Sequence, residues 1–310
     1  MEGVSKLAGA ALVEAPFGWP HEKPQAVVAL IKEARSHLQR GPATRLYLLL
    51  VGAEHQVSEK ELEEVLAGYY AAAMEVDDEL EVVVLPPFAL HNYDPRTDLR
   101  DIAVLLTLAP VSVEAQVEVN AARSSKGLPA LAFDQLETVT CTDQALQSLT
   151  QGFPTYKETV LGGTFDRLHA GHKIMLTIAV LSTEQKMVVG ITGDEMLKNK
   201  KHGDVMQPYQ QRASTTVDFL NAINPSVAYE TIEINDPYGP TLTGPTFNAI
   251  IVSEETQKGA ADINEKRKAN GLQPLEVIVV QLVHAPPGLG EGKLSSTALR
   301  EKYKKQHTGA

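Results

Sequence analysis

The chain has 310 residues, enough for two domains of ordinary size, and its 43% hydrophobic and 22% charged content is that of a globular protein. Its net charge of −11 argues against nucleic acid as a partner, because proteins that bind nucleic acid present a basic face. Its single cysteine, Cys141, excludes an internal disulfide and favours a reducing compartment.

No apolar run approaches the ~20 residues that cross a bilayer, so we expect no association with a membrane. Residues 1–19 carry Glu2, Lys6 and Glu14 and lack the order of a basic segment followed by an apolar one, which argues against a signal peptide. We therefore expect the cytoplasm as the compartment, with the nucleus as a possible additional one.

The first half of the chain alternates expected helices and strands. The patterns predict a helix at 24–38, a strand at 45–51, a helix from a capping box at 58–61 to about residue 74, and strands at 80–85, 102–108 and 128–133. Its scattered His55, His91, Tyr93 and Asp94 are interpreted as surface and core residues. We assign residues 1–150 to an amino-terminal α/β domain of unknown role. A divergent copy of the second half is one interpretation, but no repeat of residues is apparent that would support it.

A turn-rich joint at 151–156 separates the two halves. Beyond it the patterns predict a strand into residue 161, a helix through 174–181, and strands at 186–192, 227–234, 248–253 and 275–283. Pro208 begins another expected helix that ends at Asn224, and a polar helix is expected at 254–270. This alternation is typical of an α/β fold with a largely parallel sheet.

The strand that ends at Leu161 leads into the motif Gly162-Gly163-Thr164-Phe165-Asp166-Arg167-Leu168-His169-Ala170-Gly171-His172. A glycine-rich turn between a strand and a helix lets backbone N–H groups and the helix dipole face a phosphate. The spacing of His169 and His172 places both imidazoles on one helix face. Rigid donors aimed at phosphoryl oxygens stabilise a developing charge, so the motif indicates catalysis at phosphate. A metal site and two surface histidines are the alternatives for an isolated His-x-x-His pair.

Two further segments suit anion binding. Lys198, Lys200 and Lys201 lie in a loop after the expected strand at 186–192, where they are equally compatible with a solvated surface and with a grip on a substrate phosphate. Ser295, Ser296 and Thr297 offer hydroxyls and free N–H groups at a helix start, and Arg300 follows one turn later. A plain helix cap is the alternative there.

Together the motifs at 164–172 and 294–300 resemble the HxGH and ISSTxxR pair of the nucleotidyltransferase superfamily. Over residues 157–305 the resemblance narrows to eukaryotic phosphopantetheine adenylyltransferases, on the signature and on the segments 197–201, 252–256, 264–267 and 293–300. It implies a Rossmann-like catalytic domain at 157–305, with a five-stranded parallel sheet, preceded by the second α/β domain.

The resemblance also implies a reaction in coenzyme A biosynthesis. The AMP moiety of ATP would pass to 4′-phosphopantetheine by direct in-line attack without a covalent intermediate, giving dephospho-CoA and pyrophosphate. A phosphate monoester is already an anionic nucleophile, so positioning and charge stabilisation suffice. Mg²⁺ would bridge ATP oxygens through phosphate and water, with no metal site of protein ligands. Association with other enzymes of coenzyme A synthesis is a further implication.

The implied residue roles fall into three sets. The catalytic set is His172, His169, Thr164 and Lys200. The ATP-binding set is Gly162, Gly163, Thr164, Phe165, His169, Gly171, His172, Ser295, Ser296, Thr297 and Arg300. The phosphopantetheine-binding set is Thr164, Lys198, Lys200, Lys201, Arg212 and Lys258.

One segment departs from the pattern, because bacterial members carry Arg-Gly-x-Arg where this chain has Ser253-Glu254-Glu255-Thr256. Lys258 or Arg267 would then substitute for the arginines. Three rival functions remain: a cytidylyltransferase, an NMN adenylyltransferase, and a scaffold without catalysis whose amino-terminal half binds protein.

Overall fold

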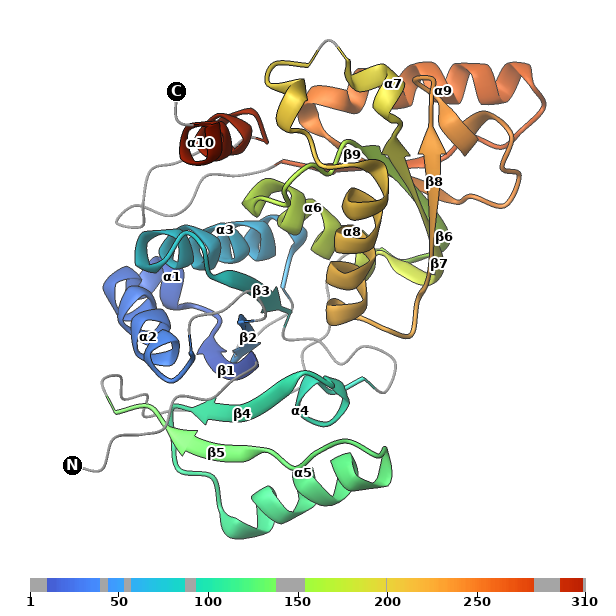
Figure 1. The fold of residues 1–310 in the computed structure, drawn as a ribbon. Helices are drawn as coiled ribbons and strands as arrows, with labels where there is room; N and C mark the ends of the chain where they lie inside the picture. Colours follow the sequence, from blue (N-terminus) through green and yellow to red (C-terminus); the bar gives the residue numbers. More distant parts are fainter. Residues whose placement is uncertain are drawn as a thin grey trace. The chain divides into compact units, whose positions relative to one another are not determined.

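A computed structural model describes residues 10–39, 44–52, 57–86, 93–137, 154–198, 200–281 and 296–308. The described residues form two compact units, one before and one after residue 152, and each unit contains a five-stranded parallel sheet (Figure 1). The expected α/β fold, with a Rossmann-like domain preceded by a second α/β domain, is confirmed. In the part of the chain that the structure describes, no helix has the length and apolar character needed to cross a membrane.

The first unit has its sheet in the order β3-β2-β1-β4-β5. Its elements are β1 (Ala10–Pro16), α1 (Trp19–Glu22), α2 (Pro24–Ser36), β2 (Arg45–Val51), α3 (Glu59–Val76), β3 (Glu81–Leu85), α4 (Pro95–Asp98), β4 (Ile102–Thr107), α5 (Val113–Ser125) and β5 (Ala132–Gln135). The side chain of Ser58 accepts a hydrogen bond from Glu61 N at 3.3 Å, so α3 begins at the predicted cap. Sequence patterns did not predict the central strand β1 or the helix α5.

The second unit has the order β10-β9-β6-β7-β8. Its elements are β6 (Tyr156–Gly163), α6 (Ala170–Leu181), β7 (Thr183–Thr192), α7 (Asp194–Leu197), η1 (Gly203–Val205), α8 (Tyr209–Ile223), β8 (Ala228–Ile234), η2 (Gly239–Leu242), β9 (Ala249–Ser253), η3 (Glu254–Thr256), α9 (Gln257–Ala269), β10 (Glu276–Val280) and α10 (Ser296–Thr308). Strand β6 pairs with both β7 and β9, so the strand that carries the signature is the central one.

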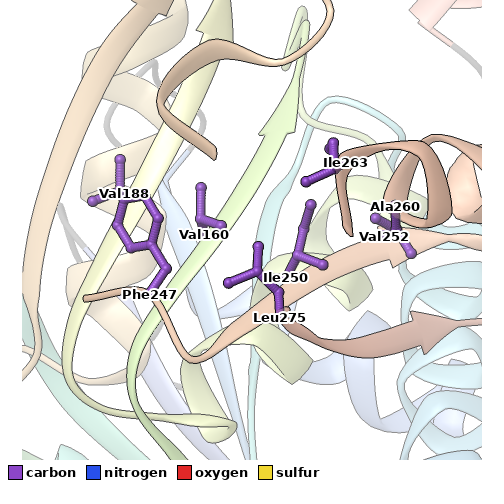
Figure 2. Close-up of a cluster of buried hydrophobic side chains, with 8 residues drawn as sticks. All are labelled: Val160, Val188, Phe247, Ile250, Val252, Ala260, Ile263 and Leu275. Atoms are coloured by element: carbon purple, nitrogen blue, oxygen red, sulfur yellow. The ribbon is translucent and has the colours of Figure 1, made fainter. Parts of the chain in front are cut away.

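An apolar cluster attaches α9 to this second sheet (Figure 2). Its side chains come from β6, β7, β9, α9 and the segments before β9 and β10: Val160, Val188, Phe247, Ile250, Val252, Ala260, Ile263 and Leu275. All eight are buried. Burying one valine, leucine, isoleucine or phenylalanine side chain contributes roughly 1.5–3 kcal/mol to stability. The cluster therefore fixes the central strands and keeps the end of β6 in place.

The two sheets have the same topology. Numbered from its own first strand, each reads 3-2-1-4-5, with β1 and β6 in the central position. The hydrogen-bonded registers agree as well: Val104 of β4 pairs with Ala11 and Ala132, as Ala249 of β9 pairs with Thr159 and Glu276. The two units therefore share one strand order and one register.

A residue-level repeat accompanies this register. Asn120-x-x-Arg123-x-x-x-Gly127 on α5 corresponds to Asn264-x-x-Arg267-x-x-x-Gly271 on α9. Each asparagine exchanges two hydrogen bonds with one residue ahead of the last strand, Leu131 or Leu275. Each arginine is fully buried and donates to three backbone carbonyls.

The glycines of this repeat explain a wrong prediction. Gly127 and Gly271 have φ values of 69° and 75°, which end their helices in the left-handed region that glycine favours. Residues 128–130 therefore belong to the turn after α5, and the strand expected at 128–133 begins only at Ala132.

The repeat also shows what the first unit lacks. Aligning Ala11 with Thr159 places Glu14 at the position of Gly162. Glu14 is buried, burial raises the pKa of its carboxyl group, and its Oε1 lies 3.5 Å from Arg96 Nε. The residues that follow β1, 17–23, contain His21 but no second histidine. The position that Gly162 occupies at the strand end of the second unit thus carries a carboxyl group in the first unit.

Replacing Arg267 by Met should lower the free energy of unfolding by about 2–4 kcal/mol, because three buried carbonyls lose a charged donor. The same change at Arg123 should destabilise the first unit similarly. Urea denaturation followed by circular dichroism measures both effects. Lys268→Met, an exposed change on the same helix as Arg267, is the matched control. Equal stability of the Arg267 variant and this control would contradict the structural role.

Candidate functional site

The site begins where β6 ends at Gly163. A Cβ atom on Gly163 would lie 2.9 Å from ring atoms of Phe165, so no larger residue fits without moving that ring. Thr192 Oγ1 at the end of β7 donates to the Gly163 carbonyl at 3.2 Å. The backbone is thereby held against the neighbouring strand at the carboxyl edge of the sheet, the edge where ligands bind in such folds.

The turn after Gly163 contains two residues in the left-handed region, Phe165 with φ 50° and Arg167 with φ 48°. Each conformation costs a non-glycine residue about 1–2 kcal/mol, so contacts must hold the turn. The Phe165 side chain is buried, and Arg167 N donates to Gln207 Oε1 at 2.7 Å. The Arg167 guanidinium also lies 4.5 Å from the ring centre of Tyr303 on α10.

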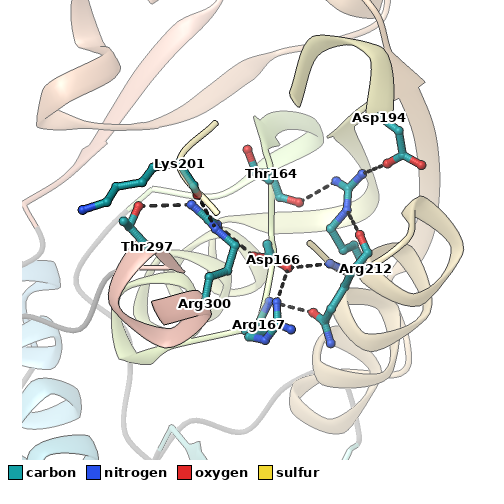
Figure 3. A network of polar contacts seen from close by, with 9 residues as sticks. Thr164, Asp166, Arg167, Asp194, Lys201, Arg212, Thr297 and Arg300 are labelled. Carbon is teal, nitrogen blue, oxygen red and sulfur yellow. Dashed lines mark hydrogen bonds and ion pairs between the residues drawn. The ribbon is translucent and has the colours of Figure 1, made fainter. Parts of the chain in front are cut away.

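Asp166, between these two residues, is fully buried and accepts from three directions (Figure 3). Its Oδ1 accepts from Gln207 N at 3.0 Å and from Arg167 at 3.1 Å, and its Oδ2 accepts from Arg300 at 2.8 Å. A buried carboxylate is tolerated only when it is paired and hydrogen-bonded in this way. Asp166 therefore connects the turn to the segment before α8 and to α10.

Arg212 on α8 supports the turn from its other side. Its guanidinium is buried and donates to the Thr164 carbonyl at 2.8 Å, to the Gln207 carbonyl at 2.9 Å and to Asp194 Oδ1 at 2.7 Å (Figure 3). These bonds give Arg212 a role in holding Thr164. Its predicted contact with phosphopantetheine stays a prediction.

His169 and His172 stand at the start of α6, a helix of 12 residues. His169 is the N-cap residue, and the two rings stack with centroids 3.9 Å apart and an interplanar angle of 23°. The Phe165 ring lies 5.4 Å from the His172 ring. The Nδ1 atoms of both histidines are buried without a hydrogen-bond partner among the described residues. The structure thus brings the two imidazoles together, but His169 has an extended backbone at the N-cap and does not lie within the helix as the spacing predicted.

Both imidazoles are neutral near pH 7. Burial lowers the pKa of His169 from its usual value to about 4, and the positive charge of Lys173 acts in the same direction. Burial lowers the pKa of His172 to about 3, and the neighbouring His169 adds to the shift. Each neutral ring carries one N–H donor, so the pair can donate to an anion beside the free N–H groups of the helix start.

The carboxyl-terminal helix α10 brings the second motif to this turn. Arg300 is buried and its guanidinium donates to Thr297 Oγ1 at 3.1 Å as well as to Asp166. The Thr297 hydroxyl accepts that bond and keeps its own proton for another acceptor. Ser296 is half-buried at the first position of the helix, and Ser295 lies outside the described residues.

The lysine loop lies between α7 and η1. Lys198 forms an ion pair with Glu195 on the surface, and Asn199 lies outside the described residues. Lys200 and Lys201 are exposed, and the Lys201 carbonyl accepts from Arg300 Nε at 3.1 Å. The backbone of the loop is therefore attached to the same arginine that holds the Ser/Thr motif.

The two candidates for the missing arginine pair lie apart from this network. Lys258 is exposed in the first turn of α9, and no hydrogen bond or ion pair found in the described part joins it to the turn. Arg267 is fully buried and donates to the Thr241, Gly244 and Gln273 carbonyls. Since Arg123 makes the equivalent bonds in a unit without the signature, Arg267 serves the fold.

Sequence reasoning missed Asp166, Gln207 and Asp194 as site residues. Asp166 stands inside the signature, but two of its three partners, Gln207 and Arg300, come from distant segments of the chain. Gln207 directly precedes Pro208, where the pattern predicts a helix start, and nothing in the sequence pairs it with residues 166 and 167. In the described residues no group of three or more His, Cys, Asp or Glu is placed to hold a metal ion.

Comparisons with known proteins show the family of the second unit. The family described as cytidylyltransferase-like matches residues 160–302. A protein of Pyrococcus abyssi named phosphopantetheine adenylyltransferase is 40% identical over 145 residues, which cover 47% of this chain and 89% of that protein. The chain belongs to the cytidylyltransferase-like family of the nucleotidyltransferase superfamily.

Other relatives of this nucleotidyltransferase differ in coverage. The Saccharomyces cerevisiae phosphopantetheine adenylyltransferase is 39% identical over 148 residues, so the match spans 47% of this chain and only about half, 48%, of that relative. An uncharacterized protein of Schizosaccharomyces pombe is 28% identical over 260 residues, covering 79% of this chain and 80% of that protein. The expected membership of the nucleotidyltransferase superfamily is confirmed.

The lowered histidine pKa values predict how stability depends on pH. An unfolded histidine titrates near pH 6.5. Below that pH the unfolded state therefore binds more protons than the folded state, in which both imidazoles stay neutral. The stability of the nucleotidyltransferase should therefore fall as the pH drops from about 6.5 toward the folded values of about 4 and 3.

Urea denaturation at pH 7.5 and pH 5.0 measures this loss. A variant with His169→Gln and His172→Gln has no imidazole to protonate at either position, so it should lose less stability between the two pH values than the unchanged chain. An equal loss in both proteins would show that the two histidines titrate normally in the folded state.

Proposed function

We propose that the chain transfers the AMP moiety of ATP to 4′-phosphopantetheine, giving dephospho-CoA and pyrophosphate. The observation that carries the proposal is the neutral His169–His172 pair at the start of α6, directly after the Gly162-Gly163 turn. The names of the Pyrococcus and yeast relatives support the choice of phosphopantetheine, because both match the half of the chain that holds this site. We assign the activity to residues 157–305.

In this proposal the start of α6 receives the triphosphate. Free backbone N–H groups at a helix start favour an anion, and two neutral imidazole donors add direction without placing two positive charges 3.9 Å apart. His172 acts at the α-phosphate, where negative charge develops during transfer. Ser296 and Thr297 hold the outer phosphates, and Thr297 has a hydroxyl proton to donate there while Arg300 occupies its lone pair.

The attacking phosphate is held by the lysine loop. Lys200 and Lys201 are exposed, whereas the ammonium group of Lys198 is already paired with Glu195, so the first two are the better candidates. In a protein with a net charge of −11, local ammonium groups are needed to offset the repulsion of a dianionic substrate. No general base is required, because the phosphate monoester is already an anion.

The donors of the site are imidazoles, hydroxyls, backbone N–H groups and ammonium groups, which suit phosphate oxygens rather than a magnesium ion. We therefore propose that Mg²⁺ is bound by phosphate oxygens and water, with no carboxylate ligand from the signature turn. When bound, the ion would neutralise charge on the triphosphate.

Pyrophosphate release tests the proposal when ATP or CTP is offered together with phosphopantetheine, phosphocholine or NMN. We expect turnover with ATP and phosphopantetheine only, because the Pyrococcus and yeast relatives are named phosphopantetheine adenylyltransferases. Faster release with CTP and phosphocholine would contradict the proposal and favour a cytidylyltransferase. Release with ATP and NMN would favour the other adenylyltransferase.

Within the same assay, His172→Ala should lower kcat by about 10²–10³-fold, because it removes a donor to the transition state. The matched control is His21→Ala. His21 lies on α1 in the first unit, so this change should leave kcat unchanged. A folded His172 variant with normal turnover would exclude the assigned role of the imidazole.

A further inference from the structure

Arg300 touches three parts of the site at once (Figure 3). Its Nη2 donates to Thr297 Oγ1 at 3.1 Å, its Nε to the Lys201 carbonyl at 3.1 Å and its Nη1 to Asp166 Oδ2 at 2.8 Å. The first acceptor belongs to the Ser/Thr motif, the second to the lysine loop and the third to the signature turn. One guanidinium thus joins segments that are 99 and 134 positions away from it in the chain.

The environment of Arg300 differs from that of a ligand for ATP. The residue is 2% exposed, so its guanidinium faces protein acceptors and not solvent. Among the described residues it is also one of two cations that neutralise the buried Asp166 carboxylate, the other being Arg167. Turning Arg300 toward a phosphate would break the Asp166 pair and leave a buried carboxylate short of one partner, which is costly.

The geometry points to Arg300 as a positioning residue that couples the two substrate sites. It holds the Ser/Thr motif and the lysine loop in register with the signature turn, so that the triphosphate and the attacking phosphate meet in line. This inference rests on the proposed function, since it takes the lysine loop as the site of the second substrate. Misplacement by about 1 Å suffices to cost roughly 10²-fold in rate, so a side chain that contacts neither substrate can control turnover.

The two roles predict opposite results for a conservative change. A lysine at position 300 keeps a positive charge, so it would preserve much of a direct contact with phosphate. It has no planar fork to reach three acceptors in three directions, so it cannot bridge Asp166, Lys201 and Thr297 together. A positioning role therefore predicts that Arg300→Lys is nearly as impaired as Arg300→Met.

The experiment compares Arg300→Lys, Arg300→Met and Asp166→Asn in the full chain with the control Lys305→Met. Lys305 lies on the same helix and is exposed in a pair with Glu301. Steady-state kinetics with ATP and phosphopantetheine should show kcat/KM for phosphopantetheine lowered about tenfold or more in all three variants, and kcat lowered as well. In the two Arg300 variants the dissociation constant of α,β-methylene-ATP, measured by calorimetry, should change less than about threefold, because Arg300 does not itself contact the triphosphate in this inference.

Hydrogen exchange gives a readout that needs no substrate. The amides at 200–203 should exchange faster in Arg300→Lys than in the control, because the Lys201 carbonyl loses its partner. Full activity of Arg300→Lys, or loss of the ATP analogue with an unchanged KM for phosphopantetheine, would overturn the inference and make Arg300 a phosphate ligand. Unchanged exchange at 200–203 in a folded variant would overturn it too.

The same data separate this inference from the proposed function. If the unchanged chain releases no pyrophosphate with ATP and phosphopantetheine, the proposed function fails. The exchange of the loop amides still decides whether Arg300 holds the loop. If Arg300→Met does not fold, Arg300→Lys and Asp166→Asn carry the comparison.

Discussion

The buried carboxylate of Asp166 is the constraint on which the site depends. It lies between two residues with left-handed backbone conformations, Phe165 and Arg167, and such a turn persists only when surrounding contacts determine it. Asp166 supplies those contacts by accepting from the segment before α8, from its own neighbour and from α10. Because the turn leads directly into His169 and His172, the placement of the imidazoles follows from how this one charge is satisfied.

Comparing the two units distinguishes the residues that support the fold from those that the proposed chemistry uses. Both units share the strand order, the register and the Asn-x-x-Arg repeat, and both Arg123 and Arg267 are fully buried. They differ at the end of the central strand, where one has Glu14 and the other Gly162. A carboxyl group at that position repels a phosphate, whereas glycine lets the backbone approach it. One difference between the units thus lies at the sheet edge where the second unit carries its signature.

The sequence predicted the second unit well because its elements end at clear turn signals, as β7 does at Thr192-Gly193 and α8 does at Asn224-Pro225. The first unit was harder. Strand β1 is rich in alanine, contains Glu14 and ends at Pro16, so its central position comes from pairing on both sides and not from local propensity. Helix α5 has only Arg123 fully buried, so it lacks a strong apolar face. The Asn-x-x-Arg repeat became visible only when the strand registers aligned its residues.

Within the site, the motif residues were predictable, but the bonds from Arg300 to positions 166 and 201 were not, because they join distant segments.

The proposed chemistry uses position and charge without a covalent step. The imidazoles have lowered pKa values and act as neutral donors in this proposal, although a histidine that attacked ATP itself would also give an adenylyl transferase. The stereochemistry at phosphorus distinguishes the two routes. Transfer from ATP that carries sulfur in one configuration at the α-phosphorus should give dephospho-CoA with that centre inverted, because a single in-line displacement inverts it. Retention of configuration would require two displacements through an adenylylated enzyme and would contradict direct attack by the phosphate of phosphopantetheine.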